Sequence, residues 1–121
     1  MGSYKAITDR TFDFSVRTIK LCQVLQEKSG VSKILSNQLL RSGTLIGANV
    51  EESQSAQSTV DFIHKLEIAL KEAKETRYWL KLLIATELIP ESSLSAMLEE
   101  INELIKIIAS IVIKTKQSNR K

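Results

Sequence analysis

The chain has 121 residues, a net charge of +3 and 43% hydrophobic residues, which is an ordinary composition for one globular domain. Four glycines and one proline predict few turns and therefore few, long elements. A single cysteine, Cys22, excludes an internal disulfide and fits a reducing compartment. The sequence has neither a membrane-length apolar run nor a signal peptide. We therefore expect one cytoplasmic domain over residues 1–121, without membrane contact.

The positive charge is unevenly distributed along the chain. Residues 1–50 carry seven basic and three acidic side chains, residues 51–103 carry five and eleven, and residues 104–121 carry five and none. The middle of the chain is therefore acidic, and the basic character comes from the first part and the C-terminal tail. This asymmetry is compatible with a polyanion site and also with electrostatic contact between subunits.

The first predicted helix spans about residues 9–28. Thr8 or Asp9 can cap its start, and Ser29 with Gly30 can end it, since glycine adopts the left-handed position after a helix. Apolar residues at helical spacing predict one broad buried face, made of Phe12, Phe14, Val16, Ile19, Leu21 and Leu25.

The second predicted helix spans about residues 32–53 and contains two glycines four residues apart. Gly43 and Gly47 therefore share one helix face. Glycine inside a helix costs roughly 1 kcal/mol relative to alanine, so we interpret the pair as positions where another helix approaches the backbone closely. The apolar stripe of this helix is Leu35, Leu39, Ile46 and Val50.

The third predicted helix spans about residues 58–88, and Ser58 with Asp61 resembles a capping box at its start. Its apolar and small residues recur in alternating steps of four and three, which is the seam of a helical bundle: Phe62, Leu66, Ala69, Ala73, Thr76, Leu80 and Leu83. The fourth predicted helix spans about residues 93–116 and is followed by a flexible tail. Its core face is Leu94, Met97, Leu98, Ile101, Leu104, Ile105, Ile108, Ile111 and Val112.

Four long helices with short connections predict an all-α, antiparallel up-down-up-down four-helix bundle. The last two helices carry more apolar surface than one seam can bury. We expect the surplus residues to form an oligomer interface, because tryptophan is enriched in interfaces and large bare patches are unusual on monomers. The alternative is that they are scattered exposed residues. The predicted interface residues are Ile68, Trp79, Leu82, Ile107 and Ile113.

No catalytic or metal-binding constellation is expected. Asp61 and His64 have the spacing found in di-iron bundles, but His64 is the single histidine and a second such motif cannot form within one chain. Cys22 lies among apolar neighbours, where thiols are usually inert. We predict no catalytic residue, no metal and no cofactor.

Basic residues are the best candidates for a binding function. Lys74, Arg77 and Lys81 fall on one face of the third helix, and Lys114 and Lys116 precede the tail that ends in Arg120 and Lys121; Arg10, Arg17 and Lys20 form another group on the first helix. Each group could contact phosphates. The alternative for each is a solvated face with ion pairs such as Asp61–Lys65 and Glu67–Lys71.

The stretch from Arg41 to Leu83 carries a family resemblance. Its first part, RSGTLIGAN at residues 41–49, and its second, from Ser58 through KLEIALKEAKETRYWLKLL at residues 65–83, resemble the 23S rRNA intervening-sequence protein family. The resemblance implies a bacterial four-helix bundle that assembles as a homopentamer and has a poorly defined role. A related branch, the accessory variability determinant of diversity-generating retroelements, forms a basic barrel that works with a reverse transcriptase and binds nucleic acid. The acidic Glu51 and Glu52 make this chain less basic than that branch.

These observations predict a non-enzymatic homo-oligomer, with a pentamer expected, that binds RNA, a ribonucleoprotein partner or a nucleic-acid-processing protein through basic residues on the assembled ring. The expected nucleic-acid-binding residues are Lys74, Arg77, Lys81, Lys114 and Lys116. The alternative is a structural or adaptor module that binds another protein without contacting nucleic acid, and a metalloenzyme is a third class. The sequence does not name the ligand.

Overall fold

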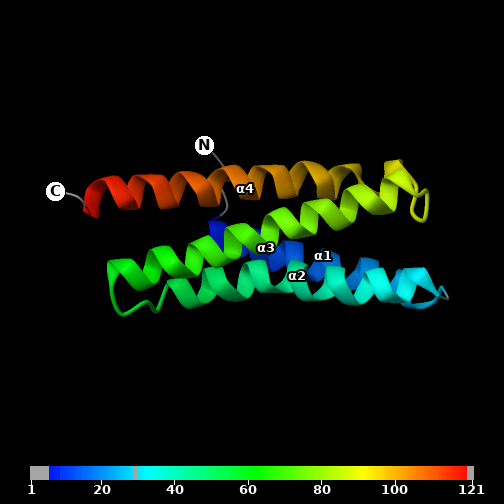
Figure 1. Ribbon diagram of the computed structural model, residues 1–121, viewed down its shortest axis with the longest axis horizontal. Helices are drawn as coiled ribbons and strands as arrows, with labels where there is room; N and C mark the ends of the chain where they lie inside the picture. Colours follow the sequence, from blue (N-terminus) through cyan, green and yellow to red (C-terminus); the bar gives the residue numbers. More distant parts are fainter. Residues whose placement is uncertain (1–5, 29, 120–121) are drawn as a thin grey trace.

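A computed structural model places residues 6–28 and 30–119, and these residues form four helices and no strand. The helices are α1 (Ile7–Gln26), α2 (Val31–Ser53), α3 (Thr59–Ala85) and α4 (Glu91–Asn119), as Figure 1 shows. The predicted all-α four-helix bundle is confirmed. Among the placed residues, no helix combines the length and the apolar character that a membrane span requires.

Each helix runs antiparallel to the next. Thr18 of α1 lies at Gly43 of α2, whereas Cys22, further along α1, bonds to the earlier residue Ser36. Cross-links between α2 and α3, and between α3 and α4, show the same reversal. They are Ser42–Thr76 with Glu52–Lys65, and Glu67–Lys116 with Arg77–Asn102.

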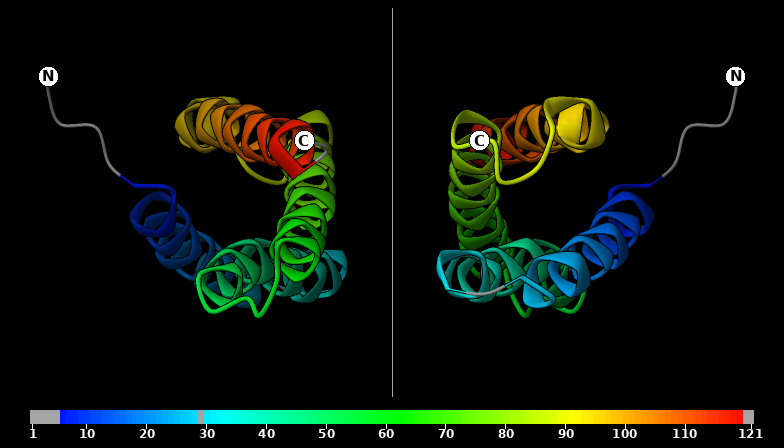
Figure 2. Two further views of the ribbon diagram at one scale, coloured as in Figure 1. Left: turned by 90° about the vertical axis from the view of Figure 1, so that its left-hand side faces the viewer. Right: turned by 90° about the vertical axis from the view of Figure 1, so that its right-hand side faces the viewer.

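The four pairs of adjacent helices in the bundle are not packed equally well. α2 packs between α1 and α3, and α3 packs between α2 and α4, but α1 meets α4 over a much shorter stretch. The views along the bundle in Figure 2 show these two outer helices diverging from each other. The α1–α4 side is therefore the loosest part of the bundle.

The helix ends differ from the predicted ones for local reasons. α1 begins at Ile7, with Ala6 rather than Thr8 or Asp9 in the capping position, because Ile7 itself packs on the core. α3 ends at Ala85, since Glu87 adopts a left-handed backbone (φ 60°) that turns Ile89 into the core. α4 begins directly after Pro90, and no glycine or proline ends it before Asn119, three residues beyond the predicted end.

Of two predictions about loops and caps, one is confirmed. Gly30 has the positive φ expected of it (65°), but its ψ is −125° and it caps the start of α2 rather than the end of α1, whose C-cap is Glu27. The Ser58 hydroxyl accepts a 3.0 Å hydrogen bond from the Asp61 backbone N–H, as a capping residue should. The Asp61 carboxylate in turn accepts from the backbone N–H of Gln57. Arg120, Lys121 and Ser29 lie outside the placed residues.

The predicted buried face of α1 is wrong in part. Phe14 and Leu25 are buried, but Phe12, Val16 and Ile19 are exposed, with 63% of the Phe12 surface accessible. Thr11 and Thr18 are buried in their place, and their hydroxyls donate to backbone carbonyls of the preceding turn. α1 therefore packs through small, internally bonded side chains and leaves an apolar stripe outside. We call Phe12, Val16 and Ile19 the α1 stripe.

The two glycines of α2 explain this choice of face. A Cβ atom at Gly43 would lie 2.6 Å from Cγ2 of Thr18, and one at Gly47 would lie 3.2 Å from the backbone oxygen of Thr11. The backbones of α1 and α2 therefore approach more closely than side chains would permit. The predicted close packing at Gly43 and Gly47 is borne out by these distances.

The cores of α3 and α4 follow the predicted seams. In the α3 seam every residue from Leu66 to Leu83 is buried, and only Phe62 is partly exposed. In α4 the predicted positions are buried or packed against the core. Small residues at Ala69 and Ala73 are fully buried, so a neighbouring helix can pack closely on this part of α3.

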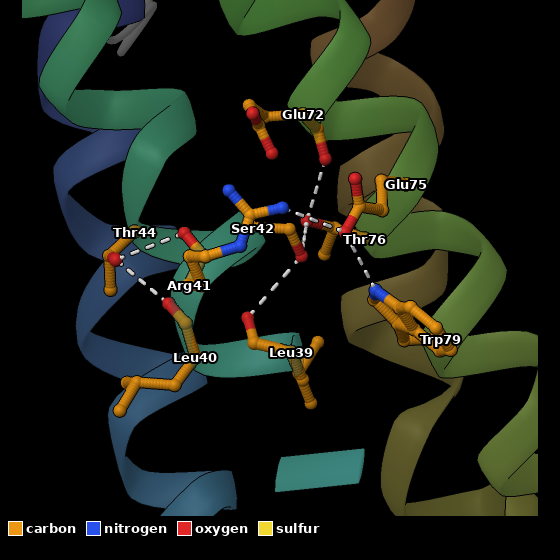
Figure 3. Close-up of polar contacts among 9 residues, drawn as sticks. All are labelled: Leu39, Leu40, Arg41, Ser42, Thr44, Glu72, Glu75, Thr76 and Trp79. Carbon is orange, nitrogen blue, oxygen red and sulfur yellow. Dashed lines mark hydrogen bonds and ion pairs between the residues drawn. The ribbon is translucent and has the colours of Figure 1, made fainter. Parts of the chain in front are cut away.

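One buried carboxylate interrupts this core. Glu72 is only 5% exposed, and its Oε1 has no hydrogen-bond partner among the placed residues. One turn away, the Thr76 hydroxyl is bonded to the Ser42 hydroxyl at 2.8 Å and donates to the Glu72 backbone carbonyl (Figure 3). A buried acceptor without a partner costs about 1–3 kcal/mol, so we expect Glu72 to lower the stability of the bundle.

We predict that Gly43→Ala destabilises the protein by about 1–2 kcal/mol, despite the better helix propensity of alanine, because the new methyl group overlaps the Thr18 side chain. Denaturant unfolding measures this change in the free energy of unfolding. In a Thr18→Ala background the same substitution should cost less, which a double-mutant cycle detects. Additive effects of the two substitutions would contradict the overlap.

We also predict that Glu72→Met raises the free energy of unfolding by about 1–3 kcal/mol, because methionine fills a similar volume without an unpaired buried acceptor. The matched control is Glu99→Met on the exposed surface, which should change stability by less than about 0.5 kcal/mol. A lower melting temperature for Glu72→Met would show that the carboxylate is satisfied in the folded protein.

Candidate nucleic-acid interface

Three predicted basic residues gather around an exposed tyrosine on the outer side of α3. The residues recur every three or four positions, so they follow one face of the helix. They line a shallow hollow of about 450 Å³. We call this surface the basic–aromatic face; it consists of Lys74, Arg77, Tyr78, Lys81, Leu82 and Ala85.

The positive charge of this face is not neutralised by its own helix. No acidic residue stands three or four positions from Lys74, Arg77 or Lys81. Lys71, by contrast, has Glu67 and Glu75 four positions away on either side. Among the placed residues, the three cations form no ion pair. Ion pairs of the kind proposed in the alternative therefore do not offset the charge of this group, and its binding role stays a prediction.

Arg77 is held in place by the neighbouring helix. Its Nη1 donates a 3.1 Å hydrogen bond to Oδ1 of Asn102 on α4, and the side chain is half-buried. Lys74 and Lys81 are exposed on either side of it. An asparagine partner orients the guanidinium without cancelling its charge, so the remaining donors of Arg77 stay available to an anion.

Tyr78 lies within the basic–aromatic face, and its ring is supported by the neighbouring ring of Trp79. It is 57% exposed, and its ring meets the Trp79 ring edge to face at 5.3 Å. The Trp79 indole N–H donates to Glu75 at 3.2 Å, and Glu75 forms an ion pair with Arg41 of α2 (Figure 3). Through this chain of contacts α2 helps to fix the position of the aromatic pair.

The two other predicted cations lie elsewhere. Lys116 forms a 2.8 Å ion pair with Glu67 near the start of α3, which offsets its charge. Lys114 lines a groove of about 370 Å³ between α1 and α4, together with Ile7, Arg10, Lys106, Ile107, Ser110 and Ile111. The structure thus unites Lys74, Arg77 and Lys81 but separates them from Lys114 and Lys116.

The α1–α4 groove is less suited to a polyanion. Its most buried cation, Arg10, forms hydrogen bonds of 3.0 and 2.7 Å to the two carboxylate oxygens of Glu100. This paired geometry is the strongest cross-link between α1 and α4 on the loose side of the bundle. In this groove Arg10 is therefore already paired with Glu100 and is less available to bind a phosphate.

The residues predicted for an oligomer interface have different environments. Ile113 is exposed, whereas Ile68, Trp79, Leu82 and Ile107 are half-buried. Trp79 packs against the core, and Ile107 lines the α1–α4 groove. That these residues form a subunit interface stays a prediction.

Groups that could carry chemistry are dispersed or enclosed. Among the placed residues, no three histidine, cysteine or acidic side chains lie close enough to share a metal ion. Cys22 is buried, its thiol donates to the Ser36 carbonyl, and burial raises its pKa above the usual value, which keeps the thiol in its less reactive form. His64 is exposed.

Tyr78 was not among the site residues predicted from the sequence. The sequence does contain a pattern that indicates this role. Cations stand four and one residues before Tyr78 and three residues after it, so on a helix the tyrosine lies among them. The opposing signal was its neighbour Trp79, which favoured an oligomer interface. The two rings are in contact but have different environments, with Tyr78 exposed and Trp79 packed against the core.

Comparison with known proteins assigns the chain to a family. Residues 5–110 match the model of the 23S rRNA-intervening sequence protein. The chain is also similar to a crystal structure from Bacteroides thetaiotaomicron, described as a protein of unknown function from the S23 ribosomal protein family. The two are 44% identical with a TM-score of 0.83, over 88% of this chain and 98% of that one. None of the curated protein sequences matches the chain. The protein belongs to the 23S rRNA-intervening sequence protein family.

Proposed function

We propose that the protein is a non-enzymatic, homo-oligomeric bundle that binds RNA through the basic–aromatic face. The observation that carries this proposal is a set of three cations, without ion-pair partners among the placed residues, around an exposed tyrosine. Cations supply the salt-dependent attraction to phosphates, and an aromatic ring supplies a surface for a base. Uncompensated charge alone would also serve solubility, but a face built only for solubility has no need of the exposed ring.

The family relationship supports an RNA ligand. The family name refers to sequences within 23S ribosomal RNA, and the Bacteroides neighbour is described under a ribosomal protein family. A second line of support is the related branch to which the family resemblance points, the accessory variability determinant, which is expected to be similar in fold and binds nucleic acid. A partner that processes nucleic acid would belong to the same proposal.

Self-association is the second part of the proposal. The α1 stripe exposes three large apolar side chains that lie about one turn apart. Ile113 and the half-buried predicted interface residues add apolar surface on other helices. We infer a homo-oligomer in the reducing cytoplasm, with a pentamer as the expected size, because contact between copies would cover this surface.

The competing function is a protein-binding adaptor. The same α1 stripe favours it, because an exposed apolar row on a helix is also a docking surface for a different protein. In that case the basic–aromatic face would have no ligand of its own. Nucleic-acid titration and solution mass distinguish the two functions.

We expect the protein to bind RNA at low salt and to lose affinity as salt rises. The double variant Arg77→Ala, Lys81→Ala should weaken binding, and it should make the dependence of log K on log salt shallower by about 0.7 for each phosphate of a single strand that the variant no longer neutralises. Fluorescence anisotropy at several salt concentrations measures both. The double variant Lys28→Ala, Lys33→Ala is the matched control, because it removes the same charge from two exposed positions that belong to none of the predicted basic groups. No binding at low salt would contradict the proposal.

We also expect native mass spectrometry to find a mass that is a multiple of 13.6 kDa. Replacing Phe12 and Ile19 of the α1 stripe with glutamate should lower that mass, because charged side chains cannot be buried in an apolar contact. Val60→Glu, at an exposed apolar position of α3, is the control and should leave the mass unchanged. A monomeric wild-type protein would contradict self-association.

A further inference from the structure

Tyr78 distinguishes the basic–aromatic face from an ordinary cluster of surface cations. A purely electrostatic site would need only Lys74, Arg77 and Lys81, whose charges attract any polyanion. The ring at the centre is 57% exposed and would cover more of its apolar surface if a flat group lay on it. We propose, on the basis of the function proposed above, that the face selects single-stranded RNA by stacking one unpaired base on Tyr78.

The ring of Tyr78 is preorganised for stacking in the free protein. Trp79 supports it edge to face at 5.3 Å and an interplanar angle of 67°. Trp79 itself is restrained by its hydrogen bond to Glu75, which is paired with Arg41. An aromatic side chain has few rotatable bonds, so a supported ring loses little conformational entropy when a base lies on it.

The cations are placed to hold the backbone of the strand on both sides of that base. Lys74 lies four residues before Tyr78 and Lys81 three residues after it, which corresponds to about 6 and 4.5 Å along the helix axis. Phosphates preceding and following a stacked base could therefore each approach a cation. Arg77, oriented by Asn102, precedes Tyr78 in the chain and lines the same hollow.

The apolar end of the face fits the same ligand. Leu82 and Ala85 continue the hollow beyond Lys81, and Leu82 is half-buried. A base or ribose can lie against apolar side chains, whereas a free phosphate gains nothing from them. The mixture of cations, one ring and a short apolar margin is typical of single-strand binding surfaces.

A paired helix of RNA is the wrong partner for Tyr78. In a duplex the bases are stacked on each other, so apart from the two end pairs, which a long duplex makes a small fraction, only unpaired bases offer a face to a protein side chain. The basic–aromatic face is one side of a helix and carries no loop or wedge that could open a duplex. Duplex RNA can therefore meet the cations but not the ring.

The test compares one short labelled single-stranded RNA with its blunt duplex, using the full-length protein. Tyr78→Ala should weaken binding of the single strand by at least about five-fold, which corresponds to the loss of one stacked base. Binding of the duplex should change by less than about two-fold, as expected for a side chain that does not take part. Tyr78→Phe should keep the wild-type affinity for the single strand.

Two controls make the result specific. Tyr78→Leu keeps an apolar side chain but removes the ring, so it should behave as Tyr78→Ala. Circular dichroism should show unchanged melting for all three variants, because Tyr78 is mainly exposed. Wild-type affinity of Tyr78→Ala for the single strand, combined with weaker binding by the Arg77 and Lys81 variant, would overturn the stacking proposal and leave RNA binding intact. Failure of the wild-type protein to bind either RNA would overturn both proposals.

Discussion

The contact between α1 and α2 at two glycines determines how the rest of the bundle is built. Without a Cβ atom at Gly43 or Gly47, α1 lies directly on the α2 backbone. Only small side chains fit there, and Thr11 and Thr18 fit because their hydroxyls bond to carbonyls of their own helix. This close contact fixes the rotation of α1, and the rotation in turn leaves the α1 stripe facing outward.

α3 joins the core to the candidate site. Its seam from Leu66 to Leu83 is buried between neighbouring helices, and the opposite side carries Lys74, Tyr78 and Lys81. Glu75 and Trp79 stand between these two sides and connect Arg41 of α2 to the exposed ring. α2 therefore reaches the surroundings of Tyr78 only through the exposed 3.4 Å ion pair of Arg41 with Glu75, a modest contribution beside that of α3 itself.

The buried face of a helix could be predicted from the sequence where large apolar residues form the contact, and not where small residues do. The seams of α3 and α4 were predictable because large aliphatic residues at heptad spacing leave one face for the core. α1 was mispredicted because size, not hydrophobicity, selected its buried face. Thr18 was buried and Phe12 exposed, which is a choice that depends on the partner helix. For the site, helical spacing grouped the three α3 cations, but the pairing of Lys116 with Glu67 needed the fold.

Electrostatics connects the two parts of the proposed function. One basic–aromatic face offers three cations, and three phosphate contacts give only weak, salt-sensitive binding. The acidic residues in the middle of the chain further reduce the attraction that a single copy exerts at a distance. Copies joined in a homo-oligomer would present several such faces to one RNA, and linked weak sites bind far more tightly than each does alone. Self-association through the α1 stripe would leave the basic–aromatic face of α3 open, since α1 and α3 are not packed against each other in the placed part of the chain, so the two proposed functions are compatible.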